Sequence, residues 1–307
     1  MIHHVYANRS NVGDWLSARG IQSLLAPLPV QEHLCDEPFV SETLGALRQA
    51  RPEDIIVIGG GGLFMDYFVP FWDGFREIAR RVPFCIWGVG YCDMKLEKSQ
   101  PPRALLEEII RLSRLCIVRD ELTRRHLQRC HLPPPVPCPT FVAVREPAPA
   151  PGHCLLHVDH YDNVGPEIYE AMVRAGEEFA TRTGRTYRQM NNLIPAGHRG
   201  ALQKSLDLYA AADLVLTSRL HGCILALAHG RPVFAVSGDH KVESFMEAAG
   251  LADWVCDLDE IDVLPQRLNQ LPSQTAPTAF VDHARRQNRA VAELVRTLAS
   301  QHHPPRP

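Results

Sequence analysis

The chain has 307 residues, of which 45% are hydrophobic, and its formal net charge is −3. This length is sufficient for two domains of ordinary size, and the small negative charge gives no electrostatic basis for binding nucleic acid. No apolar run approaches the roughly 18–20 residues of a membrane span, and the first residues lack the layout of a signal peptide. Nine scattered cysteines include no C-x-x-C pair, so no zinc knuckle is indicated, and a reducing cytoplasm is the expected compartment.

The first half of the chain alternates short apolar runs with helix-compatible segments. The predicted strands are residues 2–7, 54–58, 84–87 and 115–118. The predicted helices are residues 15–25, 41–50, 105–112 and 121–129, and residues 27–38 are predicted to be an irregular connector. This alternation favours a parallel, doubly wound sheet.

Polar residues follow two of these strands. Asn11 and Asp14 lie in the turn after the first strand, where Asp14 either caps the next helix or contacts a ligand. Arg119 ends the fourth strand and is placed to bind an anion, whereas Asp120 is the expected N-cap of the following helix.

Four consecutive glycines, residues 59–62, come directly after the second predicted strand. The P-loop pattern is absent, because no Gly-Lys-Ser/Thr follows. A run of glycines is tolerated where the backbone adopts unusual φ and ψ angles or where a ligand approaches the backbone closely. We therefore expect Gly60, Gly61 and Gly62 to line a pocket, with a tight turn as the alternative.

Residues 131–151 are rich in proline, which helix and strand interiors reject, so they are predicted to connect two domains, residues 1–145 and 146–307. The second half resumes the alternation. Its predicted strands are residues 154–158, 186–190, 214–216, 233–236 and 254–256. Its predicted helices are residues 166–181, 200–211, 220–228, 241–249 and 279–298. Two such halves would place their strand-end loops face to face across a cleft.

The unit that runs from residue 213 to residue 236 carries the clearest candidate site. Thr217, Ser218, Arg219 and His221 stand between the end of a buried strand and the start of a helix, where free backbone N–H groups attract anions. Arginine offers a bidentate fork to a carboxylate or phosphate, and histidine delivers a proton near neutral pH. A structural role, with Arg219 in a salt bridge and His221 in the first helical turn, is the alternative.

Several stretches together resemble the polysaccharide pyruvyltransferase family. They are Asn11-x-Gly13-Asp14, the glycine run between Ile58 and Leu63, Gly88-x-Gly90, Val118-Arg-Asp120, and Ser218-Arg-Leu-His-Gly222 with Ala226-Leu-Ala228 and Pro232 beyond it. Lys241 matches a lysine that the family tends to carry after the next strand. Cys138 departs from the pattern, because an acidic residue is common there.

The resemblance implies a GT-B-like fold of two Rossmann-like domains, an N-terminal acceptor side and a C-terminal phosphoenolpyruvate side with a closing helix. It implies transfer of pyruvate from phosphoenolpyruvate to a sugar as a cyclic ketal, with release of phosphate. No cofactor and no metal site are expected, because the histidines are dispersed and this chemistry does not require a metal, although a divalent ion could assist the departure of phosphate. Arg219 and Arg119 would bind the donor's carboxylate or phosphate beside Lys241, and His221 would act as the general acid or a phosphate ligand. Asp14 would contact the acceptor hydroxyl or remove its proton. The remaining residues expected to bind substrate are Gly60, Gly61, Gly62, Asn11, Ser218, Leu220 and Gly222.

The acceptor is expected to be a saccharide of a glycan or glycan precursor, which is compatible with peripheral association with membrane-bound glycan assembly. Two other functions fit the same residues. One is a GT-B glycosyltransferase that uses a nucleotide sugar, since arginine, lysine and helix N-termini also bind a diphosphate. The other is a non-catalytic protein of the same fold that binds a sugar or an anion.

Overall fold

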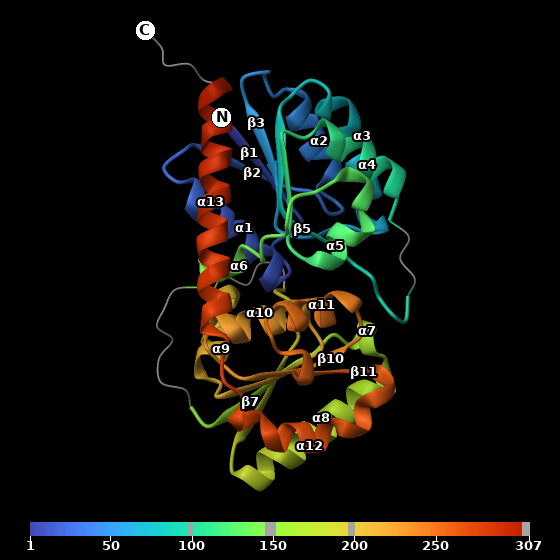
Figure 1. Ribbon diagram of the computed structural model, residues 1–307, viewed down its shortest axis with the longest axis vertical. Helices are drawn as coiled ribbons and strands as arrows, with labels where there is room; N and C mark the ends of the chain where they lie inside the picture. The colour runs from blue at the N-terminus through green and yellow to red at the C-terminus, as the bar shows by residue number, and fades with distance from the viewer. Residues whose placement is uncertain (98–100, 145–151, 196–199, 303–307) are drawn as a thin grey trace.

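A computed structural model describes residues 1–97, 101–144, 152–195 and 200–302 of the chain. It has two α/β halves, each built on a parallel sheet, and the two halves face each other across the middle of the molecule (Figure 1). This architecture confirms the predicted fold class. Within the described residues, no helix is both long and apolar enough to cross a membrane.

The first half is built on six strands that all pair in parallel. They are β1 (Ile2–Tyr6), β2 (Val30–Leu34), β3 (Ile55–Ile58), β4 (Gly61–Phe64), β5 (Phe84–Tyr91) and β6 (Leu115–Val118). The order is β2-β1-β3-β5-β4, with β6 also paired to β5. Because parallel strands end at the same edge, the loops after β1, β2, β5 and β6 are brought together.

Helices cover both faces of this sheet, so that alternate residues of a strand enter different cores. Ile56 and Ile58 pack toward one face, and Ile55 and Val57 pack toward the other. The helices of the first half are α1 (Val12–Leu25), α2 (Val40–Arg48), α3 (Val69–Ala79), α4 (Arg103–Leu112) and α5 (Glu121–His126). Figure 1 shows α2, α3 and α4 on one side of the sheet and α1 on the other.

The structure contains two strands in this half that the sequence patterns did not predict. Residues 27–38, predicted to be irregular, contain β2, an edge strand that pairs with β1 and has two of its five residues exposed. Its sequence, VQEHL, has no apolar run to mark it. Gly61 and Gly62 of the glycine run begin the other strand, β4, while Gly60 and Gly61 have φ angles of 101° and 115°. Only glycine adopts such angles readily.

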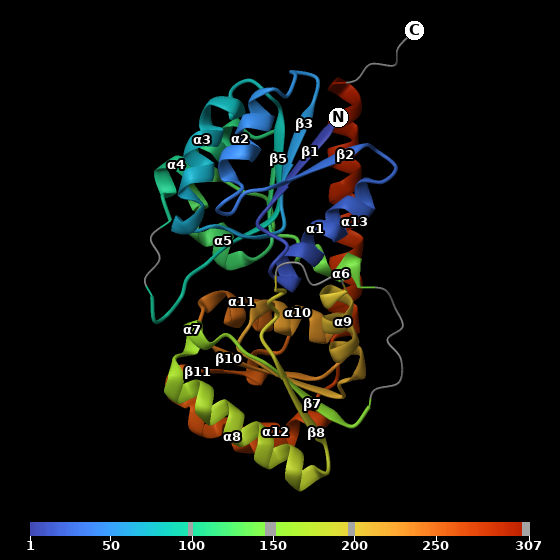
Figure 2. The ribbon, with the colours of Figure 1, turned by 180° about the vertical axis from the view of Figure 1, so that it is seen from behind.

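The second half is a five-stranded parallel sheet in the order β11-β10-β9-β7-β8. Its strands are β7 (Cys154–Val158), β8 (Thr186–Met190), β9 (Leu214–Thr217), β10 (Val233–Ser237) and β11 (Val255–Asp257). Its helices are α7 (Tyr161–Val164), α8 (Pro166–Thr183), α9 (Ala201–Ala211), α10 (Leu220–Ala228), α11 (His240–Ala248) and α12 (Leu264–Gln270). α8 and α12 cover one face, and α9, α10 and α11 cover the face toward the first half (Figure 2).

The chain passes from one half to the other through the proline-rich segment and returns through its last helix. The segment contains a short helix, α6 (Thr140–Ala143), and the predicted boundary at 145–146 lies outside the described residues. α13 (Thr278–His302) starts beside the second half and runs up along the first sheet (Figure 1). Val291 and Val295 of α13 join the core on the α1 face, and Asn288 accepts a hydrogen bond from Trp87 Nε1 at 2.9 Å. The two halves are thereby held by a helix in addition to the connector.

Candidate active site

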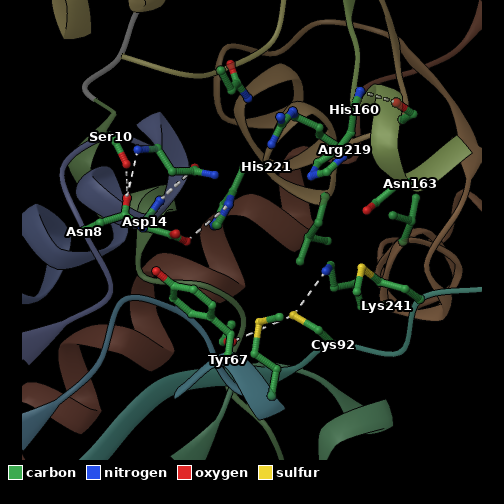
Figure 3. A pocket seen from close by; sticks show the side chains of 18 of the residues that line it. Asn8, Ser10, Asp14, Tyr67, Cys92, His160, Asn163, Arg219, His221 and Lys241 are labelled. Carbon is green, nitrogen blue, oxygen red and sulfur yellow. Dashed lines mark hydrogen bonds and ion pairs between the residues drawn. The ribbon is translucent and has the colours of Figure 1, made fainter. Parts of the chain in front are cut away.

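A cavity of about 360 Å³ lies between the two halves, at the ends of the parallel strands. Its walls come from both halves, and Figure 3 shows their side chains converging on it. The lining residues are Asn8, Ser10, Asn11, Asp14, Asp36, Gly62, Met65, Tyr67, Phe68, Cys92, Met94, Arg119, His160, Asn163, Asn192, Ser218, Arg219, Leu220, His221, Lys241 and Val242. Such a crevice is where open α/β sheets bind ligands.

Most of the residues predicted to form the site line this cavity together. They are Asn11, Asp14, Gly62, Arg119, Ser218, Arg219, Leu220, His221 and Lys241. Gly60, Gly61 and Gly222 do not line it. A Cβ at Gly61 would come within 2.9 Å of Asp14 Oδ1, and one at Gly222 within 2.0 Å of Thr217 Oγ1. Gly61 therefore allows the backbone to approach Asp14, which lines the cavity, and Gly222 allows it to approach Thr217, which precedes Ser218.

The turn between β9 and α10 positions the second half's contribution. Thr217 accepts a hydrogen bond from the Arg219 N–H at 3.0 Å and donates to the Val158 carbonyl at 2.7 Å. The Arg219 guanidinium donates from Nε to the Asp159 carbonyl at 2.5 Å, and Ser218 Oγ accepts from the His160 N–H at 2.7 Å. The loops after β7 and β9 are therefore tied to each other at the cavity wall.

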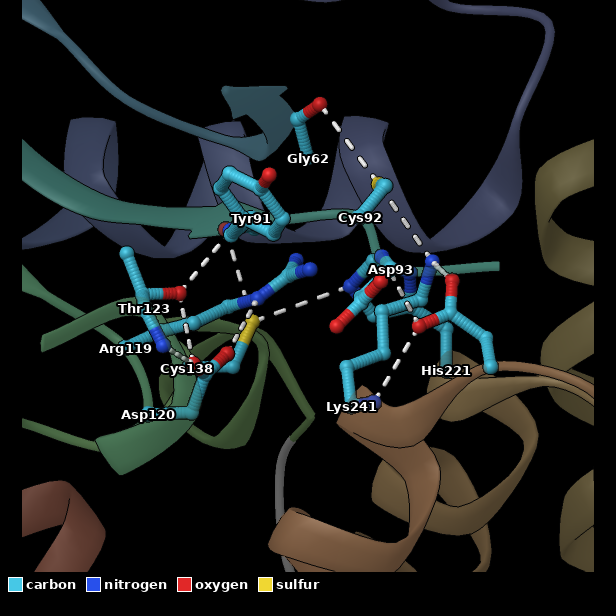
Figure 4. A network of polar contacts seen from close by, with 12 residues as sticks. Gly62, Tyr91, Cys92, Asp93, Arg119, Asp120, Thr123, Cys138, His221 and Lys241 are labelled. Atoms are coloured by element: carbon cyan, nitrogen blue, oxygen red, sulfur yellow. Dashed lines mark hydrogen bonds and ion pairs between the residues drawn. The ribbon is translucent and has the colours of Figure 1, made fainter. Parts of the chain in front are cut away.

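His221 is held between three groups of the first half. A Cβ at Gly13 would come within 2.0 Å of His221 Cγ and Nδ1, so the α1 backbone lies directly against the ring. Asp14 Oδ1 is 4.0 Å from Nδ1, and Cys138 Sγ is 3.7 Å from Nε2 (Figures 3 and 4). Cys138 is buried and also lies 3.3 Å from Thr140 Oγ1. The imidazole thus has little freedom to rotate.

Burial, followed by the charges of Arg119, Lys241 and Arg219, holds the pKa of His221 well below its usual range. The imidazole is consequently neutral at neutral pH while the cavity contains no anion. A bound anion would offset the three positive charges and favour the protonated ring.

Asp14 lies in the first turn of α1. It is not the helix cap: Asn11 is, because its side chain accepts from the N–H groups of Gly13 and Asp14 at 2.9 and 3.4 Å. Burial raises the pKa of Asp14 to about 6, against the opposing effect of the three cations. A carboxyl group with this pKa can both accept and release a proton near neutral pH.

Arg119 is buried at the end of β6 beside Asp120, with its Nε 3.3 Å from Asp120 Oδ2. Asp120 caps α5 as predicted, accepting from the Thr123 N–H at 2.7 Å. A Cβ at Gly90 would come within 2.1 Å of Arg119 Nε, so this glycine of the Gly88-x-Gly90 stretch makes room for the guanidinium.

Lys241 lines the cavity from the second half and contacts the first half (Figure 4). Its ammonium group forms an ion pair with Asp239 and lies 3.3 Å from Cys92 Sγ, which follows β5. Burial opposes the charge of the ammonium, but Cys92 and Asp239 raise the pKa of Lys241. Asp239 caps α11 and also accepts from the Asp93 N–H of the first half at 3.2 Å.

Sequence reasoning missed several residues that line the cavity. Tyr67, Cys92, His160 and Asn163 are among them. His160 follows β7, Asn163 lies in the short helix α7 directly after it, and Cys92 follows β5, so the rule that the segments after strand ends form the site would have found them. No group of three or more His, Cys, Asp or Glu side chains in the described part of the chain could hold a metal ion.

Together, the fold and the site define an α/β protein of the GT-B class with a cationic cavity between its halves. Similar solved structures include a putative UDP-N-acetylglucosamine 2-epimerase of Listeria monocytogenes, at 12% identity and a TM-score of 0.60 over 98% of this chain and 96% of that one. A UDP-GlcNAc 2-epimerase of Neisseria meningitidis has 12% identity and a TM-score of 0.59 over 96% and 99%. The pneumococcal O-GlcNAc transferase GtfA has 11% identity and a TM-score of 0.54 over 86% and 60%. At these identities the likeness concerns the fold alone.

The family model of polysaccharide pyruvyl transferase matches residues 5–240, from β1 to the start of α11. This chain therefore belongs to the polysaccharide pyruvyl transferase family, as the motifs indicated. A comparison with curated proteins found no match.

Proposed function

We propose that this chain transfers pyruvate from phosphoenolpyruvate to a saccharide, forming a cyclic ketal and releasing phosphate. The observation that carries the proposal is the gathering of Arg119, Arg219 and Lys241 around one cavity that also contains His221 and Asp14. Membership of the family supports a pyruvyl transfer, and the residues of the cavity suit this donor.

The donor is a small molecule with a carboxylate and a phosphate group, so its binding site needs several cations. Two guanidinium groups offer bidentate hydrogen bonds to such planar or tetrahedral anions, and the ammonium group of Lys241 adds a compact charge. Burial and, after it, these cations lower the pKa of His221. A bound anion offsets the effect of the cations, and the proposed reaction requires that the imidazole gains a proton as the donor binds.

The proposed reaction has two additions at the same carbon. In the first, a sugar hydroxyl oxygen bonds to C2, its proton passes to Asp14, and the C2–C3 double bond takes a proton from His221 to make a methyl group. In the second, a neighbouring hydroxyl oxygen bonds to C2 while the C2–O bond to phosphate breaks, and the leaving phosphate carries the electron pair and the second hydroxyl proton. The proton on Asp14 restores that of His221, 4.0 Å away, so the cycle closes.

The test is a phosphate-release assay with phosphoenolpyruvate and candidate glycans, with mass spectrometry to detect the ketal. Replacing His221 by Ala should lower turnover by about 10²–10⁴, the usual contribution of a general acid. His153→Ala is the control, since His153 is exposed on the second half. Near-normal turnover of a folded His221→Ala variant would remove this histidine from the mechanism.

Calorimetry separates this function from the alternatives. Binding of phosphoenolpyruvate, and weak or no binding of nucleotide diphosphates, is expected; the reverse order would favour a nucleotide-sugar transferase. Binding of phosphoenolpyruvate without turnover on a broad set of glycans would favour a non-catalytic protein. We also propose a cytoplasmic location, which the nine unpaired cysteines fit.

A further inference from the structure

Asp36 lines the cavity but belongs to no motif of the sequence. It follows β2, the strand that sequence reasoning did not predict, and its N–H donates to the Ala7 carbonyl at 3.3 Å. Its Oδ1 atom is buried and has no hydrogen-bond partner among the described residues. A buried carboxylate oxygen without a donor is costly, so this atom is suited to accept from a ligand in the cavity.

The sheet order separates the cavity into two chemically different ends. The segments that follow β1 and β2 contain the lining residues Asn8, Ser10, Asn11, Asp14 and Asp36. The segments that follow β5 and β6 contain Cys92 and Arg119. β3 lies between β1 and β5, so their axes are about 10 Å apart at the usual strand spacing. One end therefore offers amide, hydroxyl and carboxyl groups, and the other offers positive charge.

Burial is the main cause that raises the pKa of Asp14, and the charge of Asp36 adds to it against the charges of Arg119, Lys241 and Arg219, so Asp36 lies close enough to act on Asp14. Burial raises the pKa of Asp36 as well. The two carboxyl groups make this end of the cavity less favourable for an anion than the end at Arg119. A neutral polyol is attracted instead, because each of its hydroxyl groups donates one hydrogen bond.

We propose that Asp36 binds a hydroxyl group of the acceptor, so that a neutral saccharide diol lies between Asp36 and Asp14. This assignment rests on the proposed pyruvyl transfer and deepens it: it names the acceptor end of the cavity and gives Asp36 a role in selecting neutral over anionic sugars. Asp36 is a positioning residue in this role, and no proton transfer is assigned to it.

The experiment measures binding of methyl β-galactoside, methyl β-glucoside and methyl α-mannoside by saturation-transfer NMR, beside an anionic methyl glucuronide. Loss of a hydrogen bond to a charged group should weaken the neutral glycosides at least tenfold in Asp36→Asn and Asp36→Ala. The glucuronide should bind the variants better than the unaltered chain, which a general structural defect would not produce. Asp73→Asn, at an exposed position of α3, is the control.

Two outcomes overturn the assignment. If the Asp36 variants keep the same preference for neutral over anionic glycosides, Asp36 does not select the acceptor. If the unaltered chain binds none of the neutral glycosides, this end of the cavity does not take a saccharide. Binding and turnover of phosphoenolpyruvate are measured on the same samples. They test the proposed function separately, because Asp36 lies at the end of the cavity away from Arg119.

Discussion

The backbone of Gly13 lies directly against the imidazole ring of His221, so that a Cβ at this position would come within 2.0 Å of ring atoms Cγ and Nδ1. The two residues come from different halves of the chain, α1 and α10. The backbone of Gly13 therefore holds the ring beside Asp14, and this contact requires that the two halves pack against each other.

We predict that Gly13→Ala lowers turnover at least tenfold, because the added methyl group displaces either the ring or the start of α1. Alanine normally stabilises a helix by up to about 1 kcal/mol relative to glycine. Gly45→Ala in α2 is the matched control, since a Cβ there meets nothing within 4 Å, and it should raise thermal stability with unchanged activity. Equal activity of the two variants would contradict a close contact between Gly13 and His221.

The pKa of Asp14, raised to about 6 by burial, predicts the pH dependence of the reaction. The proposed reaction starts with one proton on the pair of Asp14 and His221. In the free protein His221 is neutral, so this proton is on Asp14 below about pH 6 and is lost above it, and kcat/KM should fall as pH rises through about pH 6. Asp14→Asn should remove most activity together with this fall. A residual activity in Asp14→Asn with the same pH profile would assign the titration to another group, the donor phosphate included.

The buried ion pair of Asp239 and Lys241 predicts a large effect on stability. Asp239→Asn keeps the shape of the side chain and its place as the α11 cap, but it leaves the buried ammonium group of Lys241 without its anion. Removing one partner of a buried pair costs about 3–5 kcal/mol, which urea denaturation can measure. Asp253→Asn, at an exposed position, serves as the control. A loss below 1 kcal/mol would mean that solvent or another residue already compensates this charge.

Buried histidines predict that acid weakens the fold. The Nε2 atom of His4 donates to the Gly59 carbonyl at 3.0 Å, and its Nδ1 atom accepts from Gln22 Nε2 at 3.1 Å. Burial lowers the pKa of His4 to about 4. The unfolded chain, with a pKa near 6.5, binds the proton more readily, so this stability is present above pH 6.5 and is lost as pH falls toward 4. At pH 5 the loss is roughly 2 kcal/mol for one such histidine.

The measurement is the free energy of unfolding in urea between pH 7.5 and pH 5. The burial of His157 and His33 also lowers their pKa values to about 4, so the effects add along the same pH interval. His4→Gln should be less stable at pH 7.5 but should lose less stability on acidification than the unaltered chain. An identical slope for the two proteins would show that His4 is not neutral in the fold.

The sequence by itself determined many of the elements and several strand ends. The runs at β6, β7 and β8 and the helix α10 were predicted at their observed bounds, because apolar periodicity and the residues that cap helices are local properties of the chain. The parallel sheets followed from the β-α alternation. The strand-end rule placed Arg119, Arg219 and His221 near a cavity, and the family resemblance added Lys241.

The tertiary structure alone decided which side chains meet. β2 forms because β1 offers it an edge, not because its own residues demand a strand, and Asp36 reaches the cavity only through that pairing. Cys138 meets His221, and Cys92 meets Lys241, across 83 and 149 residues of sequence. Contacts of this kind depend on strand order and on the packing of the halves, and no local pattern encodes either.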